Sequence, residues 1–231
     1  MADGRKDGNR LVVSYLALRK AVGWLGMLLP LVLVLGGMWL FGLGIQDTVS
    51  DYYYTGMRDV FVGTLCAMGV FLFSYKGYSR KDHWVGNLAG FCVILTALLP
   101  TTPVDPTPLA ATLGKLHIAF ASGYFLTLSY FSLVLFTKGA PNPTPRKKQR
   151  NQVYRTCGFI MLGAIATMAV YALVPAELKA PIERFDPIFW LESVCVVAFG
   201  ISWFVKGEGI LEDKQKKPAV PAKVAVKSDQ R

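Results

Sequence analysis

The sequence predicts an all-α protein, a polytopic membrane helical bundle of six transmembrane helices with N and C termini cytoplasmic. Its 231 residues are 53% hydrophobic with a mean hydropathy of +0.39, which is more apolar than a soluble domain of this length. A spanning helix needs roughly 20 mostly apolar residues. Such runs lie near 23–43, 59–75, 85–99, 116–136, 157–174 and 188–205. They are continuously apolar, whereas the strands of a membrane barrel would alternate, so helices are favoured.

The distribution of positive charge predicts the orientation of the bundle. All Lys and Arg residues except Arg58, Lys115, Lys179 and Arg184 fall in the two tails and in the loops after the second and fourth runs. By the positive-inside rule these segments are cytoplasmic, and the host membrane is the cytoplasmic (inner) membrane. The net charge of +10 is therefore an orientation signal. We expect membrane lipids, and no nucleic acid, as partners.

The chain divides into three parts in this interpretation. Residues 1–22 form a cytoplasmic tail with a short interfacial helix, 23–205 form the six-helix transmembrane domain, and 206–231 form a disordered basic cytoplasmic tail. Pro30 should kink the first span or mark a local break in it. No repeat of fixed period is evident.

Short sequence motifs predict a helix contact in the third run and the start of the fourth helix. Gly86 and Gly90 in the third run allow another helix to approach closely. Thr107 and Pro108 are typical of an N-cap and a first helical position, so the fourth helix should begin there and exceed the bilayer core in length.

Two further segments follow the fourth helix. The basic, Pro-containing segment 137–156 is predicted to be a solvated linker. The fifth span should end before Pro175, and Asp186 with Pro187 should cap and open the sixth.

The polar and aromatic stretch 50–59, between the first two apolar runs, is the centre of the predicted site. Asp51, Arg58 and Asp59 lie at the start of the second helix, on the non-cytoplasmic side. His117 lies near the outer boundary of the fourth helix, and Glu192 lies roughly 7 Å down the sixth. Ionisable groups inside a membrane are costly and therefore mark functional sites by default.

The sequence thus predicts a polar pocket on the outer face. Its candidate ligand-binding residues are Asp51, Tyr53, Arg58, Asp59, His117 and Glu192. Arg58 would clamp a phosphate or carboxylate, and His117 would carry a proton. The alternative is structural: Asp59 complements a helix N-terminus, Arg58 neutralises Asp51 or Glu192, and the tyrosines form an interfacial belt.

Motifs of metal, cofactor or nucleophile chemistry are not found in the sequence. His83 and His117 fall on opposite faces of the membrane, so we predict no metal and no cofactor. No G-x-S-x-G turn or phosphate-cradling loop is present. The four cysteines lie in or beside apolar runs without CxxC spacing, which is typical of core residues.

Several short patches resemble known membrane families. They are SDYYYTGMRDVFVG, LFSYKGY, NLAGF with LLPTTP, LHIAFA and FWLESVCVVAFGISWFVKG, spread over most of 10–207. They resemble a bacterial family of six-span membrane proteins defined by a domain of unknown function. In outline the chain is similar to DRAM/Sfk-type proteins, and more remotely to the CREST membrane hydrolases. The first two resemblances imply architecture alone. The last implies a zinc hydrolase, but of its three histidine ligands only His117 has a counterpart here.

Three functions stay open at this point. The first is a membrane protein that binds a small ligand or lipid headgroup at the outer cluster. The second is a membrane-embedded, possibly metal-dependent, hydrolase that uses His117 with Asp51, Asp59 or Glu192. The third is a structural accessory subunit of a membrane complex. The middles of the spans are nearly all apolar, which argues against a polar permeation path.

Overall fold

A computed structural model defines the fold and describes residues 2–75, 79–139 and 141–211. The side chains of residues 2–14 are outside this description, and so is the predicted tail beyond residue 211. Within these ranges the chain is all-helical and has no strand. The α-helices are α1 (Ala2–Phe41), α2 (Arg58–Phe73), α3 (Arg80–Leu98), α4 (Pro108–Tyr130), α5 (Pro145–Leu173), α6 (Ala176–Glu183) and α7 (Pro187–Lys206). A 3-10 helix, η1 (Ser50–Tyr54), follows α1, and a π-helical turn, η2 (Phe131–Leu135), continues α4.

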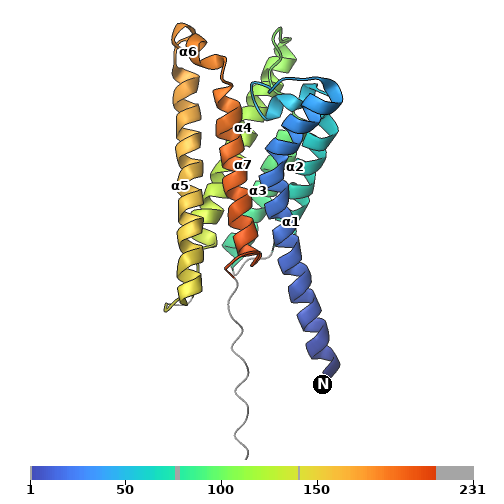
Figure 1. The fold of residues 1–231 in the computed structure, drawn as a ribbon, viewed down its shortest axis with the longest axis vertical. Coiled ribbons are helices and arrows are strands. Elements are labelled where there is room, and N and C mark those ends of the chain that lie inside the picture. Colours follow the sequence, from blue (N-terminus) through green and yellow to red (C-terminus); the bar gives the residue numbers. More distant parts are fainter. Residues whose placement is uncertain (1, 76–78, 140, 212–231) are drawn as a thin grey trace, which may run out of the picture.

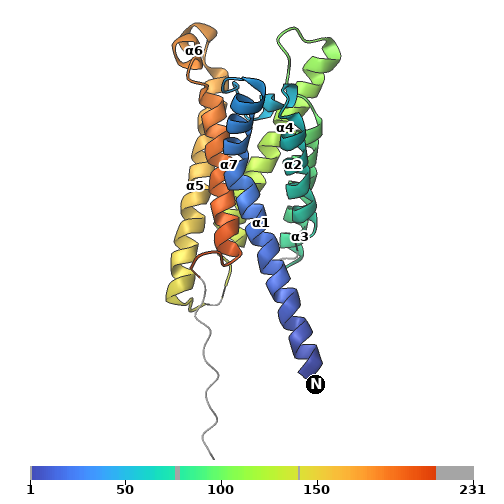
Figure 2. The ribbon, with the colours of Figure 1, turned by 45° about the vertical axis from the view of Figure 1, so that its right-hand side comes forward.

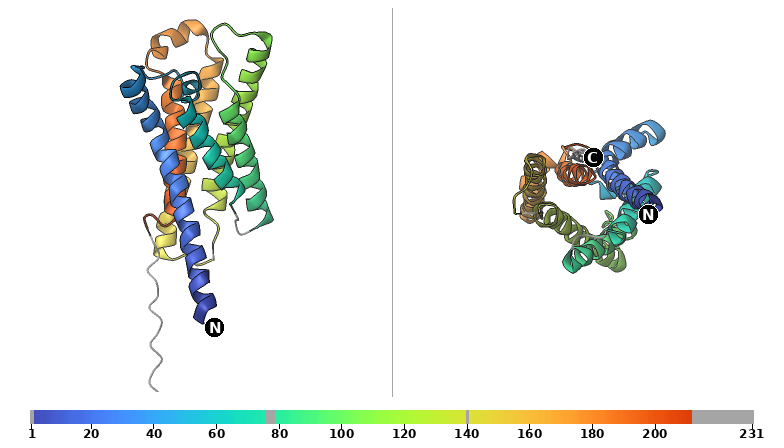
Figure 3. Two further views of the ribbon diagram at one scale, coloured as in Figure 1. Left: turned by 90° about the vertical axis from the view of Figure 1, so that its right-hand side faces the viewer. Right: turned by 90° about the horizontal axis from the view of Figure 1, so that it is seen from below.

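The long helices run side by side and form a ring (Figures 1 and 2). Around it, α1 packs on α2, α2 on α3, α3 on α4, α4 on α5, α5 on α7, and α7 again on α1, as the view from below shows (Figure 3). Large apolar side chains are buried within the ring; those of 0% or 1% exposure include Tyr52, Phe61, Met68, Leu72, Leu128, Phe131, Phe136, Tyr154 and Phe199. The bundle is therefore held by one continuous apolar core.

Four of the helices are long and apolar enough to cross a membrane. They are Tyr15–Phe41, Pro108–Leu135, Pro145–Leu173 and Pro187–Lys206. Helices α2 and α3 are not among these four. Helix α2 has 16 residues, and α3 begins with the charged sequence RKDH. Because the apolar helices carry many exposed large hydrophobic side chains, the chain has the character of a membrane-embedded protein.

Glycines bring neighbouring helices into backbone contact. A Cβ on Gly200 would lie 2.6 Å from the carbonyl oxygen of Gly23, so α7 and α1 meet without side chains between them. A Cβ on Gly90 would lie 2.9 Å from the carbonyl oxygen of Gly69, where α3 meets α2. The close approach predicted from the Gly86 and Gly90 spacing is thus confirmed.

The first helix differs in part from what its sequence predicts. Helix α1 is continuous from Ala2 to Phe41, so the expected separate interfacial helix is its N-terminal part. It also runs through Pro30 without a break in its helical assignment. Proline removes one hydrogen bond. The helix, which packs on both α7 and α2, therefore shows no local break, and the kink stays a prediction.

A Thr-Pro pair marks the start of both α4 and α5. The Thr107 side chain accepts a hydrogen bond of 3.2 Å from the Ala110 amide, and α4 begins at Pro108 as predicted. Thr144 accepts a hydrogen bond of 3.1 Å from the Lys147 amide, and α5 begins at Pro145. The predicted solvated linker over 137–156 is therefore wrong from Pro145 onward, because the capping signal outweighs polar composition.

Helix α7 begins at Pro187, as predicted, but not by the predicted cap. Asp186 adopts the left-handed conformation with φ of 49°, and its side chain makes no capping hydrogen bond. The backbone N–H of Phe189 instead donates to the carbonyl oxygen of Asp47, at 3.0 Å. A loop residue from another part of the chain therefore replaces the expected cap.

Candidate functional site

The end of the bundle that carries η1 and α6, here named the capped end, holds the residues singled out from the sequence (Figure 1). The carboxylate Oε2 of Glu192 accepts a hydrogen bond of 2.8 Å from the backbone N–H of Val49, which is the N-cap of η1. A negative charge is stabilising at a helix N-terminus. Glu192 on α7 therefore holds η1 against the bundle.

Asp51 and His117 connect η1 with the segment between α3 and α4. The Thr101 hydroxyl donates to Asp51 Oδ1 at 2.7 Å. His117 is 3% exposed, and its Nδ1 lies 2.8 Å from the carbonyl oxygen of Leu99. Asp51 is also close enough to both His117 and Glu192 for its charge to act on them. The structure thus brings three of the predicted site residues to one level.

Arg58, Tyr53 and Asp59 lie at the surface of the capped end or close to it. Arg58 and Asp59 are exposed, while Tyr53 is half-buried. The Arg58 guanidinium donates to the Tyr53 hydroxyl at 2.7 Å and lies 4.3 Å from the centre of the Tyr53 ring. Arg58 therefore contacts Tyr53, five residues away, and its side chain remains exposed.

Carboxylates surround the loop that leads into η1. Partial burial raises the pKa of Asp47, and the negative charges of Asp51, Asp186 and Glu183 raise it further. Among the described residues, no group of three or more His, Cys, Asp or Glu side chains is arranged to hold a metal ion. An anion approaching Asp47 would meet three more carboxylates, which disfavours anion binding there.

A small cavity lies beneath η1, inside the bundle. Its polar lining comes from Ser50, Thr96, Tyr124 and Glu192. The Tyr124 side chain is buried, and its hydroxyl has no hydrogen-bond partner in the described part of the chain. The cavity volume of about 20 Å³ accommodates roughly one water molecule. It is too small for a lipid headgroup or a metabolite.

The opposite end of the bundle, named the basic end, contains a cavity of about 690 Å³. This volume falls within the usual range of ligand-binding sites, roughly 300–1,000 Å³. Among the described residues, five cationic side chains and one carboxylate line the cavity: Arg19, Lys138, Lys147, Arg150, Lys206 and Glu208. We name the five cations the basic cluster.

Helix geometry explains why these cations meet. Lys147 and Arg150 are three residues apart in the first turns of α5, and Tyr154 follows four residues later, so the three share one face. Lys206 is the last residue of α7, which packs on α5, and Arg19 comes from α1 on the other side of α7. The start of α5 also presents the positive end of a helix dipole.

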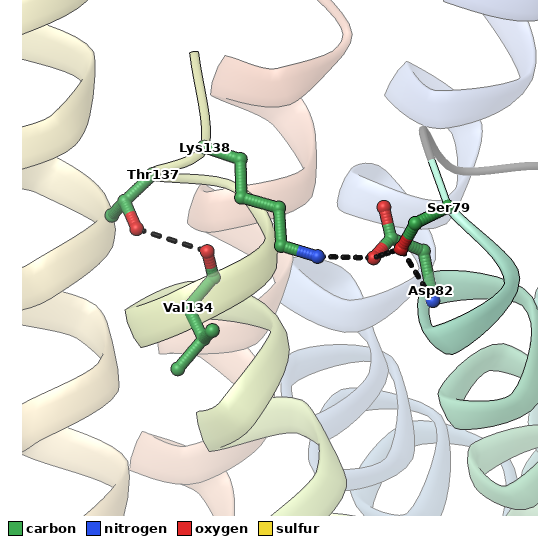
Figure 4. Close-up of polar contacts among 5 residues, drawn as sticks. All are labelled: Ser79, Asp82, Val134, Thr137 and Lys138. Carbon is green, nitrogen blue, oxygen red and sulfur yellow. Dashed lines mark hydrogen bonds and ion pairs between the residues drawn. The ribbon is translucent and has the colours of Figure 1, made fainter. Parts of the chain in front are cut away.

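Lys138 joins the cavity to α3 (Figure 4). It forms an ion pair with Asp82, a carboxylate that is 0% exposed. The Ser79 hydroxyl donates to Asp82 Oδ1 at 2.7 Å, and Thr137 donates to the carbonyl oxygen of Val134 at 3.0 Å beside Lys138. The Asp82 carboxylate therefore already holds Lys138, one member of the basic cluster.

Carbonyl oxygens and aromatic rings hold much of the remaining basic cluster. Lys147 Nζ donates to the carbonyl oxygen of Phe136 at 2.7 Å, and Lys206 Nζ lies 5.3 Å from the centre of the Phe136 ring. Arg150 Nη1 is 4.0 Å from the Glu208 carboxylate, at the limit of an ion pair. The carbonyl oxygen and the ring are neutral partners, whereas Glu208 is an anionic one.

Arg19 shows the same pattern. Its guanidinium lies 4.2 Å from the centre of the Tyr15 ring and 5.7 Å from that of the Tyr75 ring. Its Nε is buried and finds no acceptor within the described residues. Within the part of the chain that the structure describes, the basic cluster therefore has at least one free donor, Arg19 Nε.

The sequence contains a signal for this site. Its cations predict orientation first and attraction to anionic headgroups second, and the fifth span is predicted to begin only after them, near residue 157. Thr144 with Pro145 is the same start signal as Thr107 with Pro108, and a helix begun there places Lys147 and Arg150 on one face.

Comparison of the chain with protein-family models, curated proteins and solved structures finds no match. The resemblances drawn from sequence patches therefore stay predictions. Arguments about function must come from the two polar ends of the bundle.

Proposed function

We propose that the chain is an integral membrane protein that binds a phosphate-bearing anion in the cavity of the basic end. In this proposal the six long helices all span the inner membrane, and the basic end and both termini face the cytoplasm. The ring supports six spans, because α2 and α3 lie between α1 and α4, two of the apolar helices. The charge bias supports the orientation.

The gathering of five cationic side chains around one large cavity carries the proposal. Lys206 and Arg150 are each 8% exposed, and Lys206 lies within repulsive range of Arg19, Lys147 and Arg150. Asp82 and Glu208 supply carboxylates to Lys138 and Arg150. An anion in the cavity would relieve the repulsion among the cations.

The donor set favours phosphate over other anions. Arg19 and Arg150 offer planar guanidinium forks, which suit phosphate oxygens, while the lysines act as point charges. Thr144 lines the cavity at the start of α5, and helix N-termini commonly bind phosphate. A phosphate monoester carries roughly 1.5–2 negative charges and matches several cations at once.

A second candidate keeps the function predicted from the sequence, a lipid headgroup or small ligand bound at the outer face. The observation that favours it is the exposed Arg58, which is oriented by Tyr53 and faces outward in the proposed topology. The cavity beneath η1 adds little to this candidate, since it accommodates about one water molecule.

Calorimetry on the full-length protein in detergent tests the proposal. Sodium phosphate titrated at constant ionic strength should bind at one site, and Lys147→Gln should weaken binding about tenfold, the effect of losing a charge-assisted hydrogen bond. Lys148→Gln is the matched control, because Lys148 is exposed and lies outside the cavity. Absence of phosphate binding to the wild-type protein, or equal losses in both variants, contradicts the proposal.

A reporter fusion tests the orientation. Green fluorescent protein placed after Arg231 should fluoresce, because it folds in the cytoplasm, and alkaline phosphatase at the same position should be inactive. The reverse pattern would put the basic end outside and remove the cytoplasmic assignment.

A further inference from the structure

Helix α7 ends in a turn at the basic end, and Glu208 occupies the critical position of that turn. The backbone N–H of Gly209 donates to the carbonyl oxygen of Phe204 at 3.0 Å. The backbone N–H of Glu208 donates to the carbonyl oxygen of Val205 at 3.1 Å. These two hydrogen bonds form the Schellman motif of a helix C-terminus, in which the residue after the C-cap is left-handed. The C-cap is Gly207, and the left-handed residue is Glu208, with φ of 58°.

A glutamate is an unusual residue at this position. Glycine is the common one, because it adopts a positive φ without a steric penalty, and glycines stand directly before and after Glu208 in the sequence. A non-glycine residue in this conformation persists only where surrounding contacts hold it, and such strain clusters at functional sites. The side chain of Glu208 should therefore have a role of its own.

The contacts of Glu208 show what this role involves. Its carboxylate lines the cavity of the basic end and lies 4.0 Å from Arg150 Nη1. The same Nη1 donates a hydrogen bond of 3.1 Å to the carbonyl oxygen of Leu211, which also has a positive φ, 59°. Arg150 therefore contacts both left-handed residues of the turn. We name residues 207–211 the strap.

The glycines of the strap pack it against the neighbouring helices. An added Cβ on Gly207 would lie 2.9 Å from the backbone nitrogen of Lys20 on α1, and one on Gly209 would lie 2.5 Å from the Phe204 ring. The backbone of the strap is thus seated closely on α1 and α7. This seating places a carboxylate of the chain itself beside one cation of the basic cluster.

Resting on the proposed function, we infer that the strap is an autoinhibitory contact, in which Glu208 competes with the phosphate-bearing anion for Arg150 and is displaced when the anion binds. The guanidinium attracts both negative groups, so each weakens the binding of the other. The left-handed conformations of Glu208 and Leu211 favour release, because their strain is relieved once the strap leaves the cavity. The contact lowers the apparent affinity for the anion, since only the open form binds it.

Titration of sodium phosphate into the full-length protein in detergent, at constant ionic strength, tests this inference. Glu208→Gln keeps the size of the side chain and removes its charge, so phosphate should bind about fivefold more tightly than to the wild-type protein. Glu208→Gly also removes the strain, so it should show the same gain together with a higher melting temperature. Glu177→Gln, at an exposed site in the first turn of α6 at the capped end, is the control and should change neither quantity.

Hydrogen–deuterium exchange separates displacement of the strap from a change of charge alone. Saturating phosphate should increase deuterium uptake by the amides of residues 208–211 in the wild-type protein, because the strap leaves Arg150. Peptides from η1 and α6 should be unaffected. Unchanged or slower exchange in the strap overturns the inference.

The binding data distinguish failure of this inference from failure of the proposed function. Equal or weaker phosphate binding by Glu208→Gln, relative to the wild-type protein, overturns the autoinhibitory strap and leaves the anion site standing. Absence of phosphate binding in the wild-type protein and in both Glu208 variants overturns the proposed function and the strap with it.

Discussion

The two ends of this helical ring treat charge in opposite ways. At the capped end, Glu192 accepts a hydrogen bond from a loop amide, His117 contacts a carbonyl oxygen, and Asp51 accepts one from a threonine hydroxyl. At the basic end, five cations and the carboxylate of Glu208, among the described residues, line one cavity. Polar side chains that satisfy the backbone stabilise the fold, while a cavity lined by like charges attracts an ion of opposite charge.

Cavity size follows the same division. Beneath η1 the packing leaves about 20 Å³, enough for one water molecule, whereas the basic end leaves about 690 Å³. Convergence of ionisable groups from separate helices is therefore insufficient evidence for a binding pocket. Space and a concentration of like charge have to coincide.

The largest expected effect tests the structural role of the capped end. Glu192→Ala should lower the free energy of unfolding by about 2 kcal/mol, because the Val49 amide loses its acceptor in a partly buried place. Unfolding in detergent measures the loss, and calorimetry should find phosphate affinity unchanged. Glu192→Gln, which keeps an acceptor oxygen, should lose less. If Glu192→Ala instead lost phosphate binding and kept its stability, the capped end would have the binding role that is assigned here to the basic end.

At the basic end, one substitution is expected to raise the affinity for phosphate. Asp82→Asn removes the carboxylate that holds Lys138, so an anion in the cavity no longer competes with it. Affinity for orthophosphate should rise about fivefold, roughly 1 kcal/mol. Asp105→Asn, at an exposed site between α3 and α4, is the control and should leave the affinity unchanged. A weaker affinity in Asp82→Asn would mean that Asp82 positions Lys138 for the ligand.

Much of the fold could be predicted because its determinants are local. The apolar runs, the Thr107–Pro108 start and the Gly86 and Gly90 contacts each depend on a few adjacent residues. Helix α6 was missed because eight residues containing an internal proline make a weak pattern.

The basic site could not be predicted in the same way. Arg19, Arg150 and Lys206 come from three helices, and nothing in their sequence spacing says that the ring brings them together. Composition also misled, because the polar, proline-containing sequence around Pro145 suggested a linker where the structure has about three turns of α5. Conversely, the role of Glu192 depends on a loop amide from Val49, far away in sequence.

A smaller effect separates the two candidate functions. Arg58 makes an exposed contact with Tyr53, so Arg58→Gln should cost about 0.5 kcal/mol of stability or less and leave phosphate affinity unchanged. If the outer face binds an anionic lipid headgroup, the amount of anionic lipid that copurifies should fall, as mass spectrometry can measure. Arg184→Gln, another exposed arginine near the capped end, is the control. Unchanged lipid content would remove the outer candidate.

The smallest expected effect is dependent on pH. The pKa of Asp47 is raised by partial burial and by neighbouring carboxylates, so the fold disfavours its ionised form. Its contribution to stability is present below the unfolded pKa and is lost as the pH rises through the raised folded value. Asp47→Asn should therefore stabilise the protein at pH 7, by no more than about 0.5 kcal/mol since the side chain is exposed to screening. Melting temperatures between pH 4 and pH 8 should show this gain shrinking toward pH 4, with Asp105→Asn as the control. A gain that instead grew toward pH 4 would mean that Asp47 stabilises the capped end in its ionised form.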